Sequence, residues 1–224
     1  MQIPALTPRL ALAASFVPPD DVVIDVGTDH AYLPVFLLLS GKCSNAIAAD
    51  INKEPLERAA QNVAKYGLSG QIKLILCDGL AKMDASMCDT VVICGMGGET
   101  IAGILEAAPW TKDKTLILQP MTNAARLRKF LRLSGYTITD EAVAIEERHL
   151  YTVIKATGGI CEDEPLYDHI SRALLSRSGK DTMQYLDRVI AAQTKAYEGL
   201  KSAGRNTDAE AALIEKLRTL RETL

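Results

Sequence analysis

This chain has few of the features that mark membrane-spanning or secreted proteins. None of its apolar runs reaches the roughly 18 to 20 residues that a membrane helix needs. The N-terminal segment lacks a basic stretch before its apolar residues, and prolines and Arg9 interrupt it. We therefore expect a short amphipathic helix there instead of a signal peptide, and no membrane partner.

Cysteine is scarce and shows no pairing pattern. The chain has five cysteines, an odd number, and no Cys-x-x-Cys pair: Cys43, Cys77, Cys88, Cys94 and Cys161. In a chain of 224 residues this pattern predicts free thiols in a reducing, cytoplasmic environment. It argues against a disulfide framework and against a metal site.

A strong excess of charge is also missing. The net charge of −3 gives no bulk attraction to nucleic acid, so RNA binding would require a local basic patch. Nearly half of the residues are apolar, which is enough for a sizeable core. The length allows one α/β domain and a smaller appendage.

Apolar strands alternate with helical patterns over the first two thirds of the chain. The pattern predicts helices at about residues 32–40, 53–67 and 124–134. The expected strands are Val22–Val26, Asn45–Asp50, Ile72–Cys77, Thr90–Cys94 and Thr115–Gln119. This alternation is typical of a parallel sheet with right-handed crossovers.

The rhythm changes after the helix at 124–134. Residues 137–157 indicate two further strands in an antiparallel hairpin. A mostly parallel sheet with one antiparallel strand is the layout of Rossmann-like methyltransferases, so we predict an α/β protein of this class. Beyond residue 158 the heptad-like spacing of leucines predicts a helical coiled-coil hairpin. The expected domains are therefore residues 1–158 and 159–224.

Acidic residues and glycines follow four of the predicted strands. Asp25 and Gly27 close the first strand, Asp50 the second, Asp78 and Gly79 the third, and the segment Gly95–Gly98 follows the fourth. Ligands of open parallel sheets bind beyond the carboxyl ends of the strands. An acidic side chain after the second strand is suited to accept the hydroxyl protons of a ribose, and Asp78 to accept from an adenine amine. A single aspartate there is often only a turn former or helix cap, but four successive strand ends point to a nucleotide site.

The first loop indicates which nucleotide binds. A dinucleotide pyrophosphate needs further glycines after Gly27, and this chain has Thr-Asp-His-Ala-Tyr instead. Asp25 and Asp29 would also repel a pyrophosphate. S-adenosylmethionine has an adenosine, a sulfonium and an amino group and no phosphate, so we predict it as the cofactor.

Five segments together resemble a known family. DVGTDHAYLP, the AAD of the second strand, CDGL, ICGMGGETI and LILQP resemble the bacterial tRNA adenine-22 N1-methyltransferases, over about residues 6–157. The resemblance implies a class I methyltransferase domain, S-adenosylmethionine as donor, and N1 of adenine 22 in the tRNA D-arm as acceptor. It also implies that the coiled-coil arm helps to hold the tRNA. Its cofactor pocket would be lined by Asp25, Gly27, Asp50, Asp78, Gly79 and Gly95.

The expected chemistry places the acceptor beside the first loop. Adenine N1 carries a free lone pair, so the enzyme has mainly to orient the reactants. Methylation puts positive charge on the ring, so we predict Asp29 as the stabilising carboxylate, with His30 holding the loop or contacting the base. Tyr32 would stack on a flipped-out adenine. The alternatives are a helix-capping Asp29, a hydrogen-bonded loop histidine and a core tyrosine.

The remaining candidates concern the RNA. Gly97 and Gly98 would form a floor under the base, and Gln119 and Pro120 a wall or only a strand-ending turn. The best basic patch lies on the helix after Gln119, where positions 128 and 132 share a face. Its members are Arg126, Arg128, Lys129 and Arg132, with Arg9 joining them near the pocket. The alternative for the patch is a solvated helix face.

Two other functions remain open from the sequence. A methyltransferase of the same fold could act on a small molecule or a protein, which the acidic net charge favours. A non-catalytic binding module would bind no cofactor, which the residues at the strand ends oppose. No obligate protein partner is evident.

Overall fold

A computed structural model describes residues 3–224 of the chain. Met1 and Gln2, at the start of the predicted N-terminal segment, lie outside the described residues. A seven-stranded sheet has the order β3-β2-β1-β4-β5-β7-β6, in which β7 runs antiparallel to both of its neighbours. The strands are β1 Val23–Val26, β2 Ala46–Asp50, β3 Ile72–Leu76, β4 Thr90–Gly97, β5 Thr115–Thr122, β6 Tyr136–Glu146 and β7 His149–Gly158. The predicted Rossmann-like sheet with one antiparallel strand is confirmed.

The central strands are apolar because the sheet is covered on both faces. Successive residues alternate between two cores: Val23 contributes to one, and Ile24 and Val26 to the other. The same alternation divides Val92 and Ile93 on the neighbouring strand β4. Strands β1 to β5 run parallel, so their carboxyl ends lie at the same edge of the sheet, where the loops with polar residues begin.

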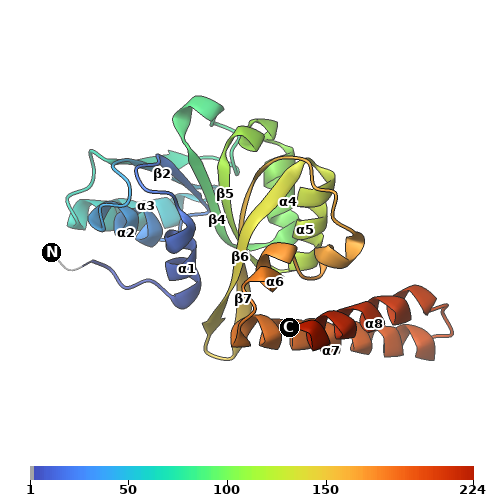
Figure 1. Ribbon diagram of the computed structural model, residues 1–224. Helices are drawn as coiled ribbons and strands as arrows, with labels where there is room; N and C mark the ends of the chain where they lie inside the picture. Colours follow the sequence, from blue (N-terminus) through green and yellow to red (C-terminus); the bar gives the residue numbers. More distant parts are fainter. Residues whose placement is uncertain (1–2) are drawn as a thin grey trace.

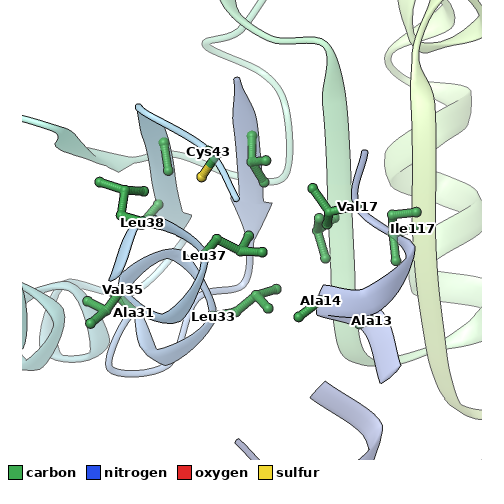
Figure 2. Packing of buried hydrophobic residues seen from close by; sticks show 14 of the residues in the cluster. Ala13, Ala14, Val17, Ala31, Leu33, Val35, Leu37, Leu38, Cys43 and Ile117 are labelled. Carbon is green, nitrogen blue, oxygen red and sulfur yellow. The ribbon is translucent and has the colours of Figure 1, made fainter. Parts of the chain in front are cut away.

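Helices pack on both faces of the sheet (Figure 1). Helices α1 Pro8–Phe16, α2 Tyr32–Leu39 and α3 Lys53–Lys65 cover one face, and α4 Gly98–Glu106 and α5 Ala124–Leu133 cover the other. Figure 2 shows Leu33 and Leu37 of α2 on one side of Ala13 and Ala14 of α1, and Ile117 of β5 on the other side. Because α1 also contacts β4 and β5, it carries Arg9 toward the carboxyl edge of the sheet.

The C-terminal part is helical, as predicted. Helix α6 Arg172–Ser176 leads into a hairpin of α7 Lys180–Ser202 and α8 Asp208–Thr223. Leu186 of α7 and Leu217 of α8 are fully buried together with Ile170 and Leu174. The far half of the hairpin projects away from the sheet (Figure 1). Three short 3-10 turns complete the described elements: Ala85–Met87, Pro109–Asp113 and Pro165–Asp168.

Candidate active site

A two-chamber groove runs along the carboxyl edge of the sheet. The larger chamber has a volume of about 410 Å³ and the smaller one about 250 Å³. Both are lined by Gly27, Cys94 and Gly95, so the chambers meet over the ends of β1 and β4. The four loops that the sequence placed at one edge therefore do form one site.

The larger chamber carries the groups suited to a nucleoside. Asp50 and Asp78 line it from the ends of β2 and β3, with Gly79 beside them. The Asp50 carboxylate accepts a hydrogen bond of 2.7 Å from the Asn52 backbone N–H, which fixes its orientation. Ile51 also lines this chamber and is 59% exposed, so it offers a free apolar surface to a planar ring.

The smaller chamber combines one cation with two carboxylates. Arg9, Asp25 and Asp29 line it together with Tyr32. Asp25 is buried, and the pKa of its carboxyl is raised to about 6. Burial is the main cause, the Thr28 hydroxyl opposes the shift, and the charge of Asp50 adds to it. Within residues 3–224 no side chain forms an ion pair with Asp25. A ligand ammonium group would supply the cation that this carboxylate lacks.

The backbone geometry at position 27 requires glycine. Its backbone has φ 75°, which side chains with a Cβ rarely adopt, and a Cβ there would lie 2.1 Å from the Met96 Cε. Gly95 opposite it has φ 81°. The two chambers therefore meet over bare backbone. Met96, which the sequence did not single out, is the flexible side chain that covers this meeting point.

The first loop is conformationally strained. His30 and Ala31 both have left-handed backbones, with φ 59° and 52°, a conformation that costs of order 1–3 kcal/mol at each non-glycine residue. The His30 carbonyl accepts from the Asn62 side chain at 2.7 Å, which holds the strained turn against α3. Strain of this kind is concentrated in functional loops.

The three candidate residues of this loop are accessible. Asp29 makes no capping hydrogen bond to α2, whose first residue follows Ala31. Its side chain is 70% exposed and lies 3.4 Å from His30 Nε2 and 3.7 Å from an Arg58 guanidinium nitrogen, a neighbour that the sequence analysis missed. Tyr32 is 42% exposed and stacks on the His30 ring with centroids 5.3 Å apart. It is therefore not a core residue.

Arg9 belongs to the groove and not to a basic patch. Its guanidinium donates to Gln119 Oε1 at 3.1 Å and lies 3.3 Å from Glu146 Oε2. Gln119 is fully buried, and its Oε1 also accepts from the Gly95 N–H at 3.1 Å. Of the two alternatives for Gln119, a wall of the base site or a residue that only ends the strand, burial rules out the wall, because the side-chain oxygen is occupied in holding Arg9 and Gly95. Pro120 is buried beside it at the end of β5.

Gly98 does not form a floor for a base. It is buried at the start of α4, and a Cβ there would lie 2.5 Å from the Asn123 carbonyl oxygen. Its small size lets α4 pack against the turn between β5 and α5. Gly97 is half-buried and has room for a Cβ 3.4 Å from Thr122 Oγ1. The role predicted for Gly98 is corrected to close backbone packing.

The predicted phosphate patch on α5 is also wrong for two of its members. Arg128 is 1% exposed and pairs with buried Glu141 at 2.6 Å. Arg132 makes two hydrogen bonds of 2.8 Å to the carboxylate of Asp168. Positions 128 and 132 do share a face, but that face packs against the C-terminal part. Arg126 and Lys129 stay exposed, and Arg126 forms an ion pair with Glu99.

The residues present fit S-adenosylmethionine. The larger chamber offers carboxylates for ribose hydroxyls and an adenine amine, and the smaller one offers Asp25 for an ammonium and Arg9 for a carboxylate. The bare backbone of Gly27 and Gly95 separates them, where the sulfonium would lie. Residues 3–224 contain no group of three or more His, Cys, Asp or Glu placed to hold a metal ion. Over the same range no helix is long and apolar enough to cross a bilayer.

Comparison with known proteins agrees with this geometry. Residues 6–154 match the family described as a methyltransferase domain. The tRNA (adenine(22)-N(1))-methyltransferase of Bacillus subtilis is 38% identical over 168 residues, which cover 74% of this chain and 70% of that protein. The crystal structure of the B. subtilis enzyme has a TM-score of 0.82, with 29% identity over 99% of this chain and 97% of that one.

A second solved structure contains the cofactor. Streptococcus pneumoniae Sp1610, described as a putative tRNA (m1A22) methyltransferase in complex with S-adenosyl-L-methionine, is 28% identical with a TM-score of 0.85. The alignment covers 97% of this chain and 100% of that one. The similarity thus extends through the C-terminal helices. The chain belongs to the family of S-adenosylmethionine-dependent tRNA (adenine(22)-N1)-methyltransferases.

Proposed function

We propose that this protein transfers a methyl group from S-adenosylmethionine to N1 of adenine 22 in the D-arm of tRNA. The observation that carries the proposal is the groove over Gly27 and Gly95, with carboxylates in both chambers and an exposed aromatic loop at its mouth. The 38% identity to the tRNA (adenine(22)-N(1))-methyltransferase of Bacillus subtilis supports the choice of substrate. A tRNA substrate would place the protein in the cytoplasm.

The cofactor would lie across the two chambers. Asp50 would accept from the ribose hydroxyls and Asp78 from the adenine amine, while Ile51 would cover the adenine ring. Asp25 would bind the ammonium group and Arg9 the carboxylate of the methionine part. Met96 would move aside, since its methyl carbon lies over Gly27. Together these contacts would fix the donor with its sulfonium over the glycines.

S-adenosylmethionine supplies an electrophilic methyl group when it is bound. The adenine N1 lone pair forms the new N–C bond and the electrons of the old bond remain on sulfur, so positive charge passes to the adenine ring and no proton has to leave first. The protein therefore contributes mainly alignment and electrostatic stabilisation. No general base is required.

The first loop supplies both contributions in this proposal. Asp29 lies at the exposed rim of the smaller chamber, where its carboxylate would stabilise the developing charge on the ring. Arg58 and His30 flank Asp29 and would fix its position. The Tyr32 ring, already stacked on His30, offers its free surface to a flipped-out adenine.

The two parts of the chain would divide the work. Residues 1–158 would carry catalysis, and residues 159–224 would form a coiled-coil arm that holds the tRNA. We do not assign tRNA contacts to Arg128 or Arg132, because both are occupied inside the protein.

The deciding experiment uses radiolabelled S-adenosylmethionine with two tRNA transcripts, one with adenine and one with guanine at position 22. Label on the first transcript alone is the expected result. Label on both would keep the methyltransferase and move its target. Label on neither, with cofactor binding intact by calorimetry, would contradict the tRNA assignment and favour a small-molecule or protein acceptor.

The role of Asp29 can be tested in the same assay. Asp29→Asn keeps the size of the side chain and removes the charge, so we expect kcat to fall at least tenfold while cofactor affinity stays unchanged. Glu57→Gln is the matched control, since it removes an exposed carboxylate from the neighbouring helix α3. Equal kcat for both variants would contradict the proposed role of Asp29.

A further inference from the structure

A second groove lies between the sheet and the base of the helical arm. It has a volume of about 280 Å³ and is formed by the turn between β5 and α5, the start of β7, and residues 185–192 of α7. Its lining includes Asn123, Tyr151, Thr152, Tyr185 and Arg188. None of its lining residues belongs to either chamber of the cofactor groove. A ligand in this groove would therefore not lie against the methyl donor.

One buried hydroxyl in this groove has no partner. Thr152 is 1% exposed, and its Oγ1 forms no hydrogen bond with any atom of residues 3–224. A buried hydroxyl without a partner costs free energy, and native proteins rarely leave one unpaired. Because Thr152 lines the groove, a bound ligand with a polar edge would satisfy it. This unpaired group indicates a ligand site.

The other lining residues indicate the kind of ligand. Tyr151 and Tyr185 provide aromatic surface, and the Tyr185 hydroxyl is fixed by a hydrogen bond of 3.0 Å from Arg128 Nη2. Arg188 is exposed at the groove and forms no ion pair with any residue in the described part of the chain. Aromatic rings, a hydroxyl and a free guanidinium are the groups that bind an unstacked base and its phosphate.

The groove and the cofactor site meet across two paired strands. Pro120, which lines the groove, is the register partner of Met96, which lines the larger chamber. Gln119, one residue before Pro120, binds the Gly95 N–H at the floor of the cofactor groove. The second groove therefore lies one strand away from the cofactor site, close enough for a nucleotide next to the methylated base to reach it.

We infer that the groove between β5, β7 and α7 binds a nucleotide that flanks the methylated adenine in the tRNA. Thr152 hydrogen-bonds its base, the tyrosines pack against it, and Arg188 binds its phosphate. This inference rests on the proposed tRNA methylation and names the part of the protein that selects the RNA. It also gives the fixed base of the arm a direct function.

Two conservative variants test it. Thr152→Val keeps the side-chain volume and removes a hydroxyl that has no partner in the protein, so the fold is not weakened. We expect the KM for tRNA to rise about fivefold, the effect of one lost hydrogen bond, with the KM for S-adenosylmethionine unchanged. Arg188→Gln should raise the KM for tRNA about tenfold and reduce the slope of log affinity against log salt by about 1.

A matched control separates the groove from the general charge of the arm. Arg218→Gln removes one exposed arginine from α8, away from the groove. We expect it to behave like the wild type. If Thr152→Val and Arg188→Gln bind and methylate tRNA as Arg218→Gln does, the inference is overturned.

The flanking position is tested with synthetic tRNA that lacks one base, at position 21 or at position 23. We expect one of these to weaken binding in the wild type, and to weaken it less in Thr152→Val, because that variant has already lost the hydrogen bond to the base but keeps the packing against the tyrosines. Independent losses at both positions would overturn the assignment. Binding is measured by fluorescence anisotropy, so it is separate from activity: wild-type protein that binds this tRNA without methylating it contradicts the proposed function and still tests the groove.

Discussion

Two regions of this protein bury charge, and they treat it in opposite ways. In the smaller chamber, the Asp25 carboxylate is 6% exposed and no cation of residues 3–224 pairs with it. At the junction between sheet and arm, Arg128 and Glu141 are 1% and 0% exposed and pair at 2.6 Å. Arg128 also donates to the carbonyl oxygens of Asp168 and His169 and to the Tyr185 hydroxyl.

The pKa values of these groups follow the same contrast. Burial alone would lower the pKa of the Arg128 guanidinium, but the Glu141 carboxylate outweighs burial and holds that pKa above its usual range. At Asp25 burial dominates and raises the pKa to about 6. The buried charge of Arg128, which stabilises the fold, is paired inside the protein, whereas the buried carboxylate of Asp25, which we assign to ligand binding, pairs with no cation of residues 3–224. The unpaired group is therefore the better indicator of a binding site.

Removing one partner of the buried Arg128–Glu141 ion pair should have the largest effect on stability. Arg128→Met leaves Glu141 buried and without a partner, and we expect a loss of roughly 3–5 kcal/mol in the free energy of unfolding. Urea unfolding followed by circular dichroism measures it. A loss below about 1 kcal/mol would show that the pair contributes little.

The double variant Arg128→Met/Glu141→Leu is the control. Replacing a whole buried ion pair with apolar side chains is often close to neutral. We expect the double variant to be more stable than Arg128→Met alone. The remaining loss would measure the hydrogen bonds from Arg128 to Asp168, His169 and Tyr185.

Removing the unpaired charge should have the opposite effect on stability. The folded-state pKa of Asp25 lies above the value of 3.8 for an exposed aspartate. The cost is therefore fully present above about pH 6, where folding keeps the carboxylate charged and buried, shrinks as the pH falls from 6 to 4, and disappears below about pH 3, where the carboxyl is protonated in both states. The shift corresponds to about 3 kcal/mol. We expect Asp25→Asn to stabilise the cofactor-free protein by up to that amount at pH 8 and by only about 0.5 kcal/mol at pH 4, measured as unfolding free energy at both pH values.

The same variant should lose the cofactor. An ammonium group bound beside Asp25 favours the ionised carboxylate, so wild-type affinity for S-adenosylmethionine should fall as the pH drops below about 6. Asp25→Asn should bind at least tenfold more weakly at pH 8 and show no such fall. Calorimetric titrations between pH 5 and pH 8 compare the two proteins. An affinity that falls equally in both would place the titrating group elsewhere.

The sequence correctly brought the residues at the carboxyl edge of the sheet together, but it misplaced the arginines between the sheet and the helical arm, for a physical reason. Strand ends follow from local apolar runs, and parallel strands bring Asp25, Asp50 and Asp78 to one edge whatever their helices do. The partners of Arg128 are Glu141 and residues near 168, which only the tertiary fold brings to α5. Spacing showed that positions 128 and 132 share a face but not which way that face points.

A local signal for Arg128 did exist. Leu127 and Leu131 precede Arg128 and Arg132 by one position each, and both leucines are fully buried. The two arginines therefore lie next to the apolar stripe of α5, while Arg126 and Lys129 are exposed. Arginine beside an apolar stripe is a candidate for a buried pair, and a distant carboxylate should then be sought. The two left-handed residues His30 and Ala31 gave no comparable signal.

A smaller effect is expected where backbone packing supports the ligand edge. Gly98→Ala would put a Cβ 2.5 Å from the Asn123 carbonyl oxygen, so α4 or the β5–α5 turn must shift. We expect a loss of about 1–3 kcal/mol in thermal or urea unfolding. Gly97→Ala is the matched control, because its Cβ would lie 3.4 Å from Thr122 Oγ1 at φ −65°. Equal stability of the two variants would contradict close backbone packing as the reason for glycine at position 98.

The smallest effect should come from the exposed side of α5. Arg126→Gln/Lys129→Gln removes two exposed cations, of which Arg126 forms an ion pair with exposed Glu99. Exposed ion pairs are worth little because water and salt screen them, so unfolding free energy should change by no more than about 0.5 kcal/mol. If these cations bind phosphate, tRNA affinity will fall and lose salt dependence while stability stays unchanged. Anisotropy titrations of tRNA at two salt concentrations decide this. Unchanged tRNA binding would show that this face of α5 is a solvated surface, in contrast to the face with buried Arg128.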